Sequence, residues 1–311
     1  MKKTNLLAIL TLVATPAFLH AQTTSYSDVV GYSKITAPGG TVIVVPTFVK
    51  ASSFSGSSLV ASDGFACSSF TANQLAPNAG SAYPKAYVEI TSGAFEGYTF
   101  DVSSNTTSKI SVSGIPADLV GTTVSIAVRN HLTLDDLAAG QSGLVDYDSG
   151  VTIYNPDGTA SVRYFASPSW VADDYSTPAG DTVIYPGSGF TLSSGGSSFT
   201  FTGVVKAGKT VIPLYAGAVN LVGPLNPSNA KLITEISIAP ALDVYSDGIN
   251  RFSNNGQMVI ETTYYSDGTD VLDSGYAPFT PSASDSVNLN SGFVVSVSQN
   301  RRWTYPSPLN P

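Results

Sequence analysis

The chain has 311 residues, of which only 12% are charged, and it contains 28 Gly and 19 Pro but a single Cys. Its formal net charge of −8 disfavours nucleic acids and anionic membranes as partners, because both are bound through clustered cations. The low charge, together with 42% hydrophobic residues, excludes a charge-driven disordered tail and a long coiled coil, and is enough for one or two packed cores.

Residues 1–21 have the three-part pattern of a secretory signal peptide. Lys2 and Lys3 precede an apolar run over 6–13, and Ala21 is a small residue at a suitable cleavage point. That run is too short to cross a bilayer, and no later stretch approaches the roughly 18 apolar residues of a membrane helix. The sequence predicts an exported protein without a transmembrane segment, located in the periplasm, on the outer surface or in the medium. The alternative is a buried N-terminal helix.

Short β-branched or alternating runs bounded by Gly, Pro, Asn or Ser recur along the chain, which is the pattern of strands between turns. Helical periodicity is nearly absent. The best candidate is 133–140, where a Thr cap, acids in the first turn and a terminal Gly fit one or two turns of helix. Cys67 lies among apolar residues, which predicts a small buried side chain. The clearest strand runs lie at 42–45, 87–90, 110–112, 124–128 and 293–297.

Parts of the sequence occur twice. The segment 150–158 matches 248–256 at a constant offset of 98, and 181–190 matches 285–293 with one residue fewer. A weaker match relates 41–46 to 210–213, each preceded by a Gly. Two copies are too few for a solenoid, which stacks several units.

These patterns predict an all-β fold: an internally duplicated β-sandwich or a pair of small β-barrels, with at most short helical turns. The first unit is expected over 22–202, with an inserted β-meander at about 84–130. The second, shorter unit is expected over 203–311.

Four blocks of the sequence carry a family resemblance. They are the start at 28–32, the Ile-Thr-Ser-Gly block at 90–93 with Glu-Gly at 96–97, the Asp-x-Val…Gly-Phe block near the end of each copy, and the finish at 302–306. Together they resemble an uncharacterised family of exported bacterial proteins with many paralogues, mainly in the Verrucomicrobia and Planctomycetes groups. The resemblance spans nearly the whole chain after the signal peptide. It implies export and fold, and it supplies no catalytic residue.

Catalytic constellations are hard to assemble from this sequence. A Ser-His-Asp device would need His131 as its base, with Asp135 one helical turn on, but no Gly-x-Ser-x-Gly elbow exists. We interpret His131 as a polar residue at a strand-to-helix junction. A glycosidase needs only two acids, yet nothing in the spacing of the four Glu residues selects a pair. We therefore predict no catalytic residue and no cofactor. The four Glu residues are Glu89, Glu96, Glu235 and Glu261.

Calcium is the ligand chemistry that the composition favours. Asp267, Asp270 and Asp273 lie close together in a loop-like segment, and Ca²⁺ is bound by several carboxylate and carbonyl oxygens from flexible loops. The segment does not follow the twelve-residue calcium-loop pattern. Turn formation by these Asp residues is the main interpretation, and a calcium site is the alternative.

Aromatic residues are dense between 147 and 175 and recur over 264–276. We select Tyr164, Trp170 and Tyr175 as candidate ligand-binding residues, because flat aromatic faces beside Asp and Asn can stack on sugar rings or hold a protein partner. The alternative is that these aromatics fill the core of a sandwich.

The favoured interpretation is a secreted or cell-surface structural and binding protein without catalytic activity. Its partner would be an extracellular protein, a glycan or a second copy of the chain. The alternatives are a carbohydrate-directed module that binds or hydrolyses glycans, and a calcium-stabilised adhesin.

Overall fold

The computed structural model describes residues 29–36, 39–139, 141, 143–194, 198–225, 231–253, 255–278, 286–287 and 292–306. Among these residues the regular structure is almost entirely β-strand, with one short α-helix and three short 3₁₀ helices. The predicted all-β fold class is confirmed. The predicted signal peptide, residues 1–21, lies outside the described residues. Within the described ranges, no helix is long and apolar enough to span a membrane.

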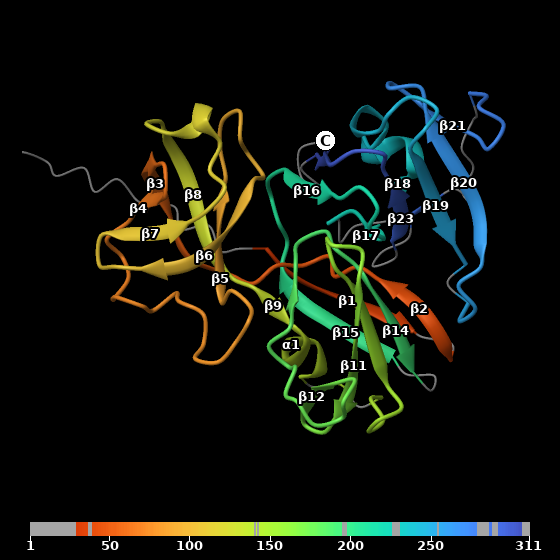
Figure 1. Ribbon diagram of the computed structural model, residues 1–311, viewed down its shortest axis with the longest axis horizontal. Helices are drawn as coiled ribbons and strands as arrows, with labels where there is room; N and C mark the ends of the chain where they lie inside the picture. Colours follow the sequence, from red (N-terminus) through yellow and green to blue (C-terminus); the bar gives the residue numbers. More distant parts are fainter. Residues whose placement is uncertain are drawn as a thin grey trace, which may run out of the picture.

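Six strands close into a small barrel, on the left of Figure 1, in the order β3-β4-β7-β6-β5-β8. Buried and exposed residues alternate along β6 and β7, since successive side chains of a strand point to opposite faces. The inward set forms one apolar core that includes the free Cys67, so the prediction that Cys67 is buried is confirmed. The barrel elements are β3 (Ser52–Ala61), β4 (Gly64–Ala66), β5 (Ala86–Ile90), β6 (Thr99–Asn105), β7 (Lys109–Val112), η1 (Ala117–Leu119) and β8 (Thr123–Asn130).

A five-stranded antiparallel sheet and a two-stranded ribbon form the first half of the molecule, in the lower centre of Figure 1. The sheet order is β12-β11-β10-β14-β2, the ribbon is β1-β15, and both enclose one core together with the helix α1. The elements are β1 (Val30–Thr36), β2 (Gly40–Val44), β9 (Leu132–Thr133), α1 (Leu134–Ala138), β10 (Gly150–Tyr154), β11 (Ala160–Ala166), β12 (Ser169–Ala172), β13 (Val183–Ile184), β14 (Phe190–Ser194) and β15 (Ser198–Val204).

The second half, on the right of Figure 1, has its own core, its own five-stranded sheet in the order β21-β20-β19-β23-β17, and its own ribbon β16-β24. Its elements are β16 (Thr210–Leu214), β17 (Asn220–Val222), β18 (Lys231–Leu232), η2 (Ile233–Ile236), η3 (Ala239–Ala241), β19 (Gly248–Phe252), β20 (Ile260–Ser266), β21 (Val271–Leu272), β22 (Ser286–Val287), β23 (Phe293–Ser296) and β24 (Arg301–Tyr305).

The two halves have the same strand order. Read from one edge, β12-β11-β10-β14-β2 corresponds to β21-β20-β19-β23-β17, and the ribbon β1-β15 corresponds to β16-β24. The matched segments 150–158 and 248–256 begin with β10 and β19, the middle strand of each sheet. The weaker match does not hold, because 41–46 contains β2 whereas 210–213 lies in β16, the counterpart of β1.

The barrel is inserted in the first half between β2 and β9. In the second half, the next described strand after β17 is β18. The meander was expected at about 84–130, but the barrel covers Ser52–Asn130, because β3 pairs with β8 and β4 pairs with β7. The expected unit boundary between 202 and 203 falls inside β15, whose partner β1 begins the first half.

The two halves contact each other in a nearly symmetric way through their hairpin turns. Thr41 N donates to Gly256 O at 2.9 Å, and a Cβ on Gly40 would lie 2.4 Å from the same oxygen. At the equivalent place, a Cβ on Gly158 would lie 3.1 Å from Gly217 O. Gly158 and Gly256 hold the same position in the matched segments, so glycine is needed there for close backbone approach. Between the sheets lies a small apolar cluster of Ile43, Val45, Tyr154, Leu221, Phe252, Met258 and Val294.

The predicted helical segment 133–140 forms α1 over Leu134–Ala138. Thr133 caps it: its hydroxyl accepts from Asp136 N, and the Asp136 carboxylate accepts from Thr133 N at 2.8 Å. This reciprocal capping satisfies amide groups that have no partner within the helix, which is why so short a helix is defined. Gly140 lies outside the described residues.

Candidate functional site

Each half carries a cluster of three tyrosines. In the first tyrosine cluster, Tyr147, Tyr164 and Tyr175, the ring of Tyr175 stacks on Tyr164 with centroids 4.7 Å apart and planes 25° apart. Tyr147 meets Tyr175 edge-on at 6.0 Å. Tyr147 and Tyr175 keep 55% and 51% of their surface exposed, so the cluster presents open aromatic faces to solvent.

The second tyrosine cluster, Tyr245, Tyr265 and Tyr276, repeats this arrangement. Tyr276 lies on Tyr265 with centroids 4.4 Å apart and planes 33° apart, and Tyr245 meets Tyr276 edge-on at 5.7 Å. Tyr245 and Tyr276 are 54% and 47% exposed. Tyr245 stands 98 positions after Tyr147, the same offset as the adjoining sequence match.

A glycine on the neighbouring strand makes room for the strand-borne ring of each cluster. Tyr164 on β11 pairs with Gly150 on β10, and a Cβ on Gly150 would lie 3.5 Å from the Tyr164 ring. A Cβ on Gly248 would lie 3.8 Å from the Tyr265 ring. In both halves the ring therefore lies across a glycine, an arrangement that stabilises a glycine-bearing strand.

The other two tyrosines of each cluster sit on turns with left-handed backbone. The φ angles are 60° at Tyr147, 59° at Tyr175, 57° at Tyr245 and 61° at Tyr276. They make up four of the seven non-glycine residues with positive φ in the described part of the chain. A bulky residue in this region costs on the order of 1–3 kcal/mol, which Gly would avoid and Asn would reduce.

Backbone hydrogen bonds hold these turns against the strand ends in the same way in both halves. Tyr147 N donates to Phe165 O at 2.7 Å, and Tyr245 N donates to Ser266 O at 2.9 Å. Tyr175 N donates to Ala172 O, and Tyr276 N donates to Asp273 O, both at 3.0 Å. The turn geometry is therefore fixed by the main chain, and the side chains are free to serve the surface.

Tyr175 and Tyr276, the outer ring of each stacked pair, have raised pKa values. A hydrogen bond with Tyr164 raises the pKa of the Tyr175 hydroxyl, and one with Tyr265 raises the pKa of Tyr276. Next to Tyr175, Asp174 accepts from the Thr177 hydroxyl and from the amides of Thr177 and Ser176, which lowers the pKa of its carboxyl to about 2. In the first cluster the ionised Asp174 carboxylate therefore lies beside the Tyr175 phenol at neutral pH.

Of the three aromatic residues selected from the sequence, the structure brings Tyr164 and Tyr175 together but places Trp170 in the core. Trp170 is 1% exposed, and its indole Nε1 donates to Leu134 O at 2.9 Å. Its pairing partner on β11 is Phe165, which is also buried. The burial of Trp170 leaves no ring face open to a ligand, because on β12 this residue points toward the inner face of the sheet.

Sequence reasoning missed part of the site. It did not single out Tyr245, although the offset of 98 from Tyr147 would have found it. It also did not separate the buried Tyr264, which is 1% exposed, from its neighbour Tyr265 on the other face of β20.

Two of the three calcium candidates, Asp267 and Asp273, act as turn formers, and Asp270 contributes its backbone amide to the turn of Asp267. Asp267 Oδ1 accepts from the amides of Thr269 at 2.8 Å and Asp270 at 2.7 Å, and these bonds lower the pKa of its carboxyl. Asp273 Oδ1 accepts from Gly275 N and from Ala277 N, and these bonds hold the turn of Tyr276. Throughout the described ranges, no group of three or more His, Cys, Asp or Glu side chains is placed to hold a metal ion.

His131 lies between β8 and the two-residue strand β9, which leads into α1, as its interpretation as a junction residue predicts. Its Nε2 is 3.0 Å from Asp101 Oδ1, and its Nδ1 is buried without a hydrogen-bond partner among the described residues. Tyr185 donates to the other oxygen of Asp101 at 3.1 Å, and burial together with Asp101 raises the pKa of Tyr185. Asp135, the expected orienting acid, instead accepts from the Ser169 hydroxyl at 2.7 Å.

Three of the four Glu residues considered for a glycosidase pair are engaged in separate ion pairs or hydrogen bonds. Glu89 is 2% exposed between two cations, whereas Glu261 forms a surface ion pair with Arg251 at 3.4 Å. Glu96 accepts from Lys209 N at 3.2 Å.

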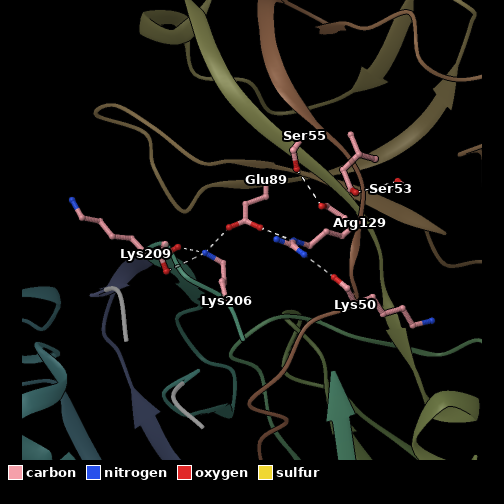
Figure 2. A network of polar contacts seen from close by, with 10 residues as sticks. Lys50, Ser53, Ser55, Glu89, Arg129, Lys206 and Lys209 are labelled. Carbon is pink, nitrogen blue, oxygen red and sulfur yellow. Dashed lines mark hydrogen bonds and ion pairs between the residues drawn. The ribbon is translucent and has the colours of Figure 1, made fainter. Parts of the chain in front are cut away.

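A buried ionic network attaches the barrel to the connection between the halves (Figure 2). Glu89 on β5 lies 2.6 Å from Lys206 Nζ and 3.0 Å from Arg129 Nε on β8. Arg129 also donates to Lys50 O at 2.8 Å, and Lys206 donates to Lys209 O. All three charged side chains are at most 8% exposed, so each depends on the others for its stability.

Comparisons with known proteins found no match: no protein-family model, no curated protein and no solved structure is similar to this chain at a significant level.

Proposed function

We propose that the chain is an exported structural and binding protein that acts without catalysis, and that its two tyrosine clusters are its contact surfaces. One observation carries the proposal: left-handed, half-exposed tyrosines occur at the same two places in each half, four in all.

Local stability does not account for these tyrosines. Each left-handed tyrosine costs on the order of 1–3 kcal/mol, and each ring pair returns about 0.5–1.5 kcal/mol. The two terms nearly cancel, so a Gly at the turn would serve the fold equally well. Strained residues that persist without a stability gain commonly mark binding sites. Tyr is also the residue that gives large contact area at a low entropy cost.

Export is supported by the N-terminal sequence. The basic start, short apolar run and small residue at 21 favour passage across the inner membrane, toward the periplasm, the outer surface or the medium. The resemblance to an exported bacterial family points the same way. A chain with one buried Cys must be stabilised by packing in such a compartment.

A glycan-binding role is the second candidate, favoured by the carboxylates beside the first cluster. Asp173 is close enough to Tyr175 to raise its pKa, and carboxylates accept hydrogen bonds from sugar hydroxyls while rings stack on sugar faces. Binding fits the arrangement better than hydrolysis, because Glu89 is already held between Arg129 and Lys206.

The test compares the mature protein with the double variant Tyr175→Ala/Tyr276→Ala and with the control Tyr32→Ala, whose side chain is 77% exposed outside both clusters. Binding to a glycan array, self-association by sedimentation and binding to envelope extracts of the producing cells are measured. We expect the wild type and the control to bind in at least one assay and the double variant to lose that binding.

Two results would contradict the proposal. Equal binding by the double variant, or no binding by the wild type in all three assays, removes the clusters as contact surfaces. Turnover of a substrate that stops on one substitution removes the non-catalytic assignment.

A further inference from the structure

We propose that the stacked pairs Tyr164–Tyr175 and Tyr265–Tyr276 are sites of oxidative cross-linking, at which each pair of phenols becomes one dityrosine. The inference goes beyond the proposed binding role, because it rests on the pair geometry and requires no ligand.

The two pairs are held in the arrangement from which phenol rings couple. Their centroids are 4.7 and 4.4 Å apart, and their planes are inclined by 25° and 33°. Rings at this separation and inclination lie over each other, so carbons of one ring are close to carbons of the other. A fixed approach of this kind replaces a bimolecular encounter and raises the effective concentration of one ring at the other by orders of magnitude.

The other tyrosine contacts in the clusters are not arranged in this way. Tyr147 meets Tyr175 at 60° and 6.0 Å, and Tyr245 meets Tyr276 at 79° and 5.7 Å. An edge-on ring does not overlap its partner. The geometry therefore selects one coupling per cluster, although all three rings of each cluster are close together.

The outer ring of each pair is accessible to an oxidant. Tyr175 and Tyr276 are 51% and 47% exposed, whereas the buried Tyr87 and Tyr264 are 2% and 1% exposed. A one-electron oxidant at the surface can therefore reach the stacked pairs directly.

The reaction balances with hydrogen peroxide as the oxidant, used by a haem peroxidase that removes one electron at a time. Each of the two phenols loses one electron and one proton and becomes a phenoxyl radical. The radicals form a carbon–carbon bond between ortho carbons, and the hydrogen on each of those carbons moves to the oxygen to restore two phenols. Each cross-link consumes one peroxide, which takes up the two electrons and two protons and leaves as two water molecules.

Cross-linking would supply a covalent constraint that cysteine cannot supply here. The chain has one Cys, so an internal disulfide is impossible. In each pair the two tyrosines are eleven positions apart, at 164 and 175 and at 265 and 276. A bond between them would close a short loop around the strained turn and restrict the unfolded chain, as a disulfide does.

The experiment treats dilute mature protein with hydrogen peroxide and a haem peroxidase, then measures dityrosine fluorescence, intact mass and cross-linked peptides. We expect the loss of two hydrogen atoms per cross-link, with peptides joining 164 to 175 and 265 to 276, in protein that remains a monomer on a denaturing gel. Dityrosine per chain should not change over a tenfold dilution, because the coupling is intramolecular.

Conservative variants keep the test independent of folding. Tyr175→Phe should lose the first cross-link and keep the second, Tyr276→Phe the reverse, and the control Tyr147→Phe should keep both. Circular dichroism checks that each variant is folded. Cross-links that map mainly to other tyrosines, that form mainly between chains, or that do not form at all would overturn the proposal.

Discussion

The two halves of the molecule agree closely at their surface clusters and differ in how they fill their cores. Each cluster takes its tyrosines from equivalent strands and turns. In contrast, the buried tryptophan comes from β12 in the first half and from β24 in the second. Trp170 donates to Leu134 O in α1, and Trp303 donates to Ile236 O in η2 at 3.0 Å.

The different strands that carry Trp170 and Trp303 indicate that a core position can be filled by a large side chain from more than one strand. A core accepts another large apolar residue from another strand if volume and hydrogen bonds are kept. The tyrosines have not been exchanged in this way, although their backbone is strained. We take this as the reason to assign function to the clusters and stability to the tryptophans.

The largest expected effect concerns the barrel, which has no counterpart in the part of the second half that the structure describes. Glu89→Gln would leave Arg129 and Lys206 buried without a counter-charge, and removal of one partner from a buried ion pair costs about 3–5 kcal/mol. We expect a loss of this size in the free energy of unfolding, measured with urea.

The matched control is Glu261→Gln, whose side chain is 46% exposed beside Arg251. An exposed pair contributes about 0–1 kcal/mol, so this variant should unfold close to the wild type. Equal effects of the two substitutions would contradict the assignment of Glu89 as the attachment of the barrel.

The next effect compares the two tryptophans. Trp170→Phe and Trp303→Phe each remove the N–H that satisfies a buried carbonyl, and we expect losses of about 1–3 kcal/mol in both cases. Similar urea midpoints for the two variants would support the same structural role on different strands. A variant that unfolds like the wild type would show that its indole hydrogen bond is dispensable.

The sequence predicted the fold class, the helical turn and strands such as those at 42–45 and 124–128, because these depend on local patterns. It missed the start of the barrel, because the Ser- and Gly-rich segment Ser52–Ala61 looks like a loop until its exposed and buried residues are seen to alternate. It missed the ionic network as well. A lone Glu89 between Val88 and Ile90 signals a buried charge, but its partner Lys206 lies in a distant connection.

The candidate site could be predicted only in part. Tyr164 and Tyr175 stood out by aromatic density, and so did Trp170, because density does not say which face of a strand a residue occupies. The register that pairs Trp170 with Phe165 places both rings in the core. The left-handed backbone of the tyrosines could not be predicted, because a bulky residue is rare in that region.

A smaller effect separates strain from stacking within a cluster. Tyr175→Asn loses about 0.5–1.5 kcal/mol of ring contact but relieves a comparable strain, since Asn tolerates the left-handed region. We expect its free energy of unfolding to stay within about 1 kcal/mol of the wild type. Tyr164→Ala removes a ring from a regular strand position without relieving strain, and it should be clearly less stable in the same urea experiment. The reverse order of the two variants would contradict the argument that strain offsets stacking.

The smallest effect is a pH dependence of the first cluster. The hydroxyl of Thr177 and the two amides that Asp174 accepts from hold its pKa at about 2, below the value of about 3.9 in an unfolded chain. Because the folded pKa is lowered, the turn is stabilised fully above about pH 4, and this stabilisation is lost as the pH falls toward 2. The second-half turn at Asp273 receives backbone amides.

We therefore expect acid to loosen the turn of Tyr175 in the wild type, and Asp174→Asn to remove that pH dependence while leaving the turn of Tyr276 unchanged. Amide NMR signals of Ser176 and Thr177, followed from pH 6 to pH 2, would measure this directly. The exposed position of Asp174 means that added salt should weaken the effect. Identical titration curves for the wild type and Asp174→Asn would show that the carboxylate does not hold the turn, and the two clusters would then depend on the same backbone contacts alone.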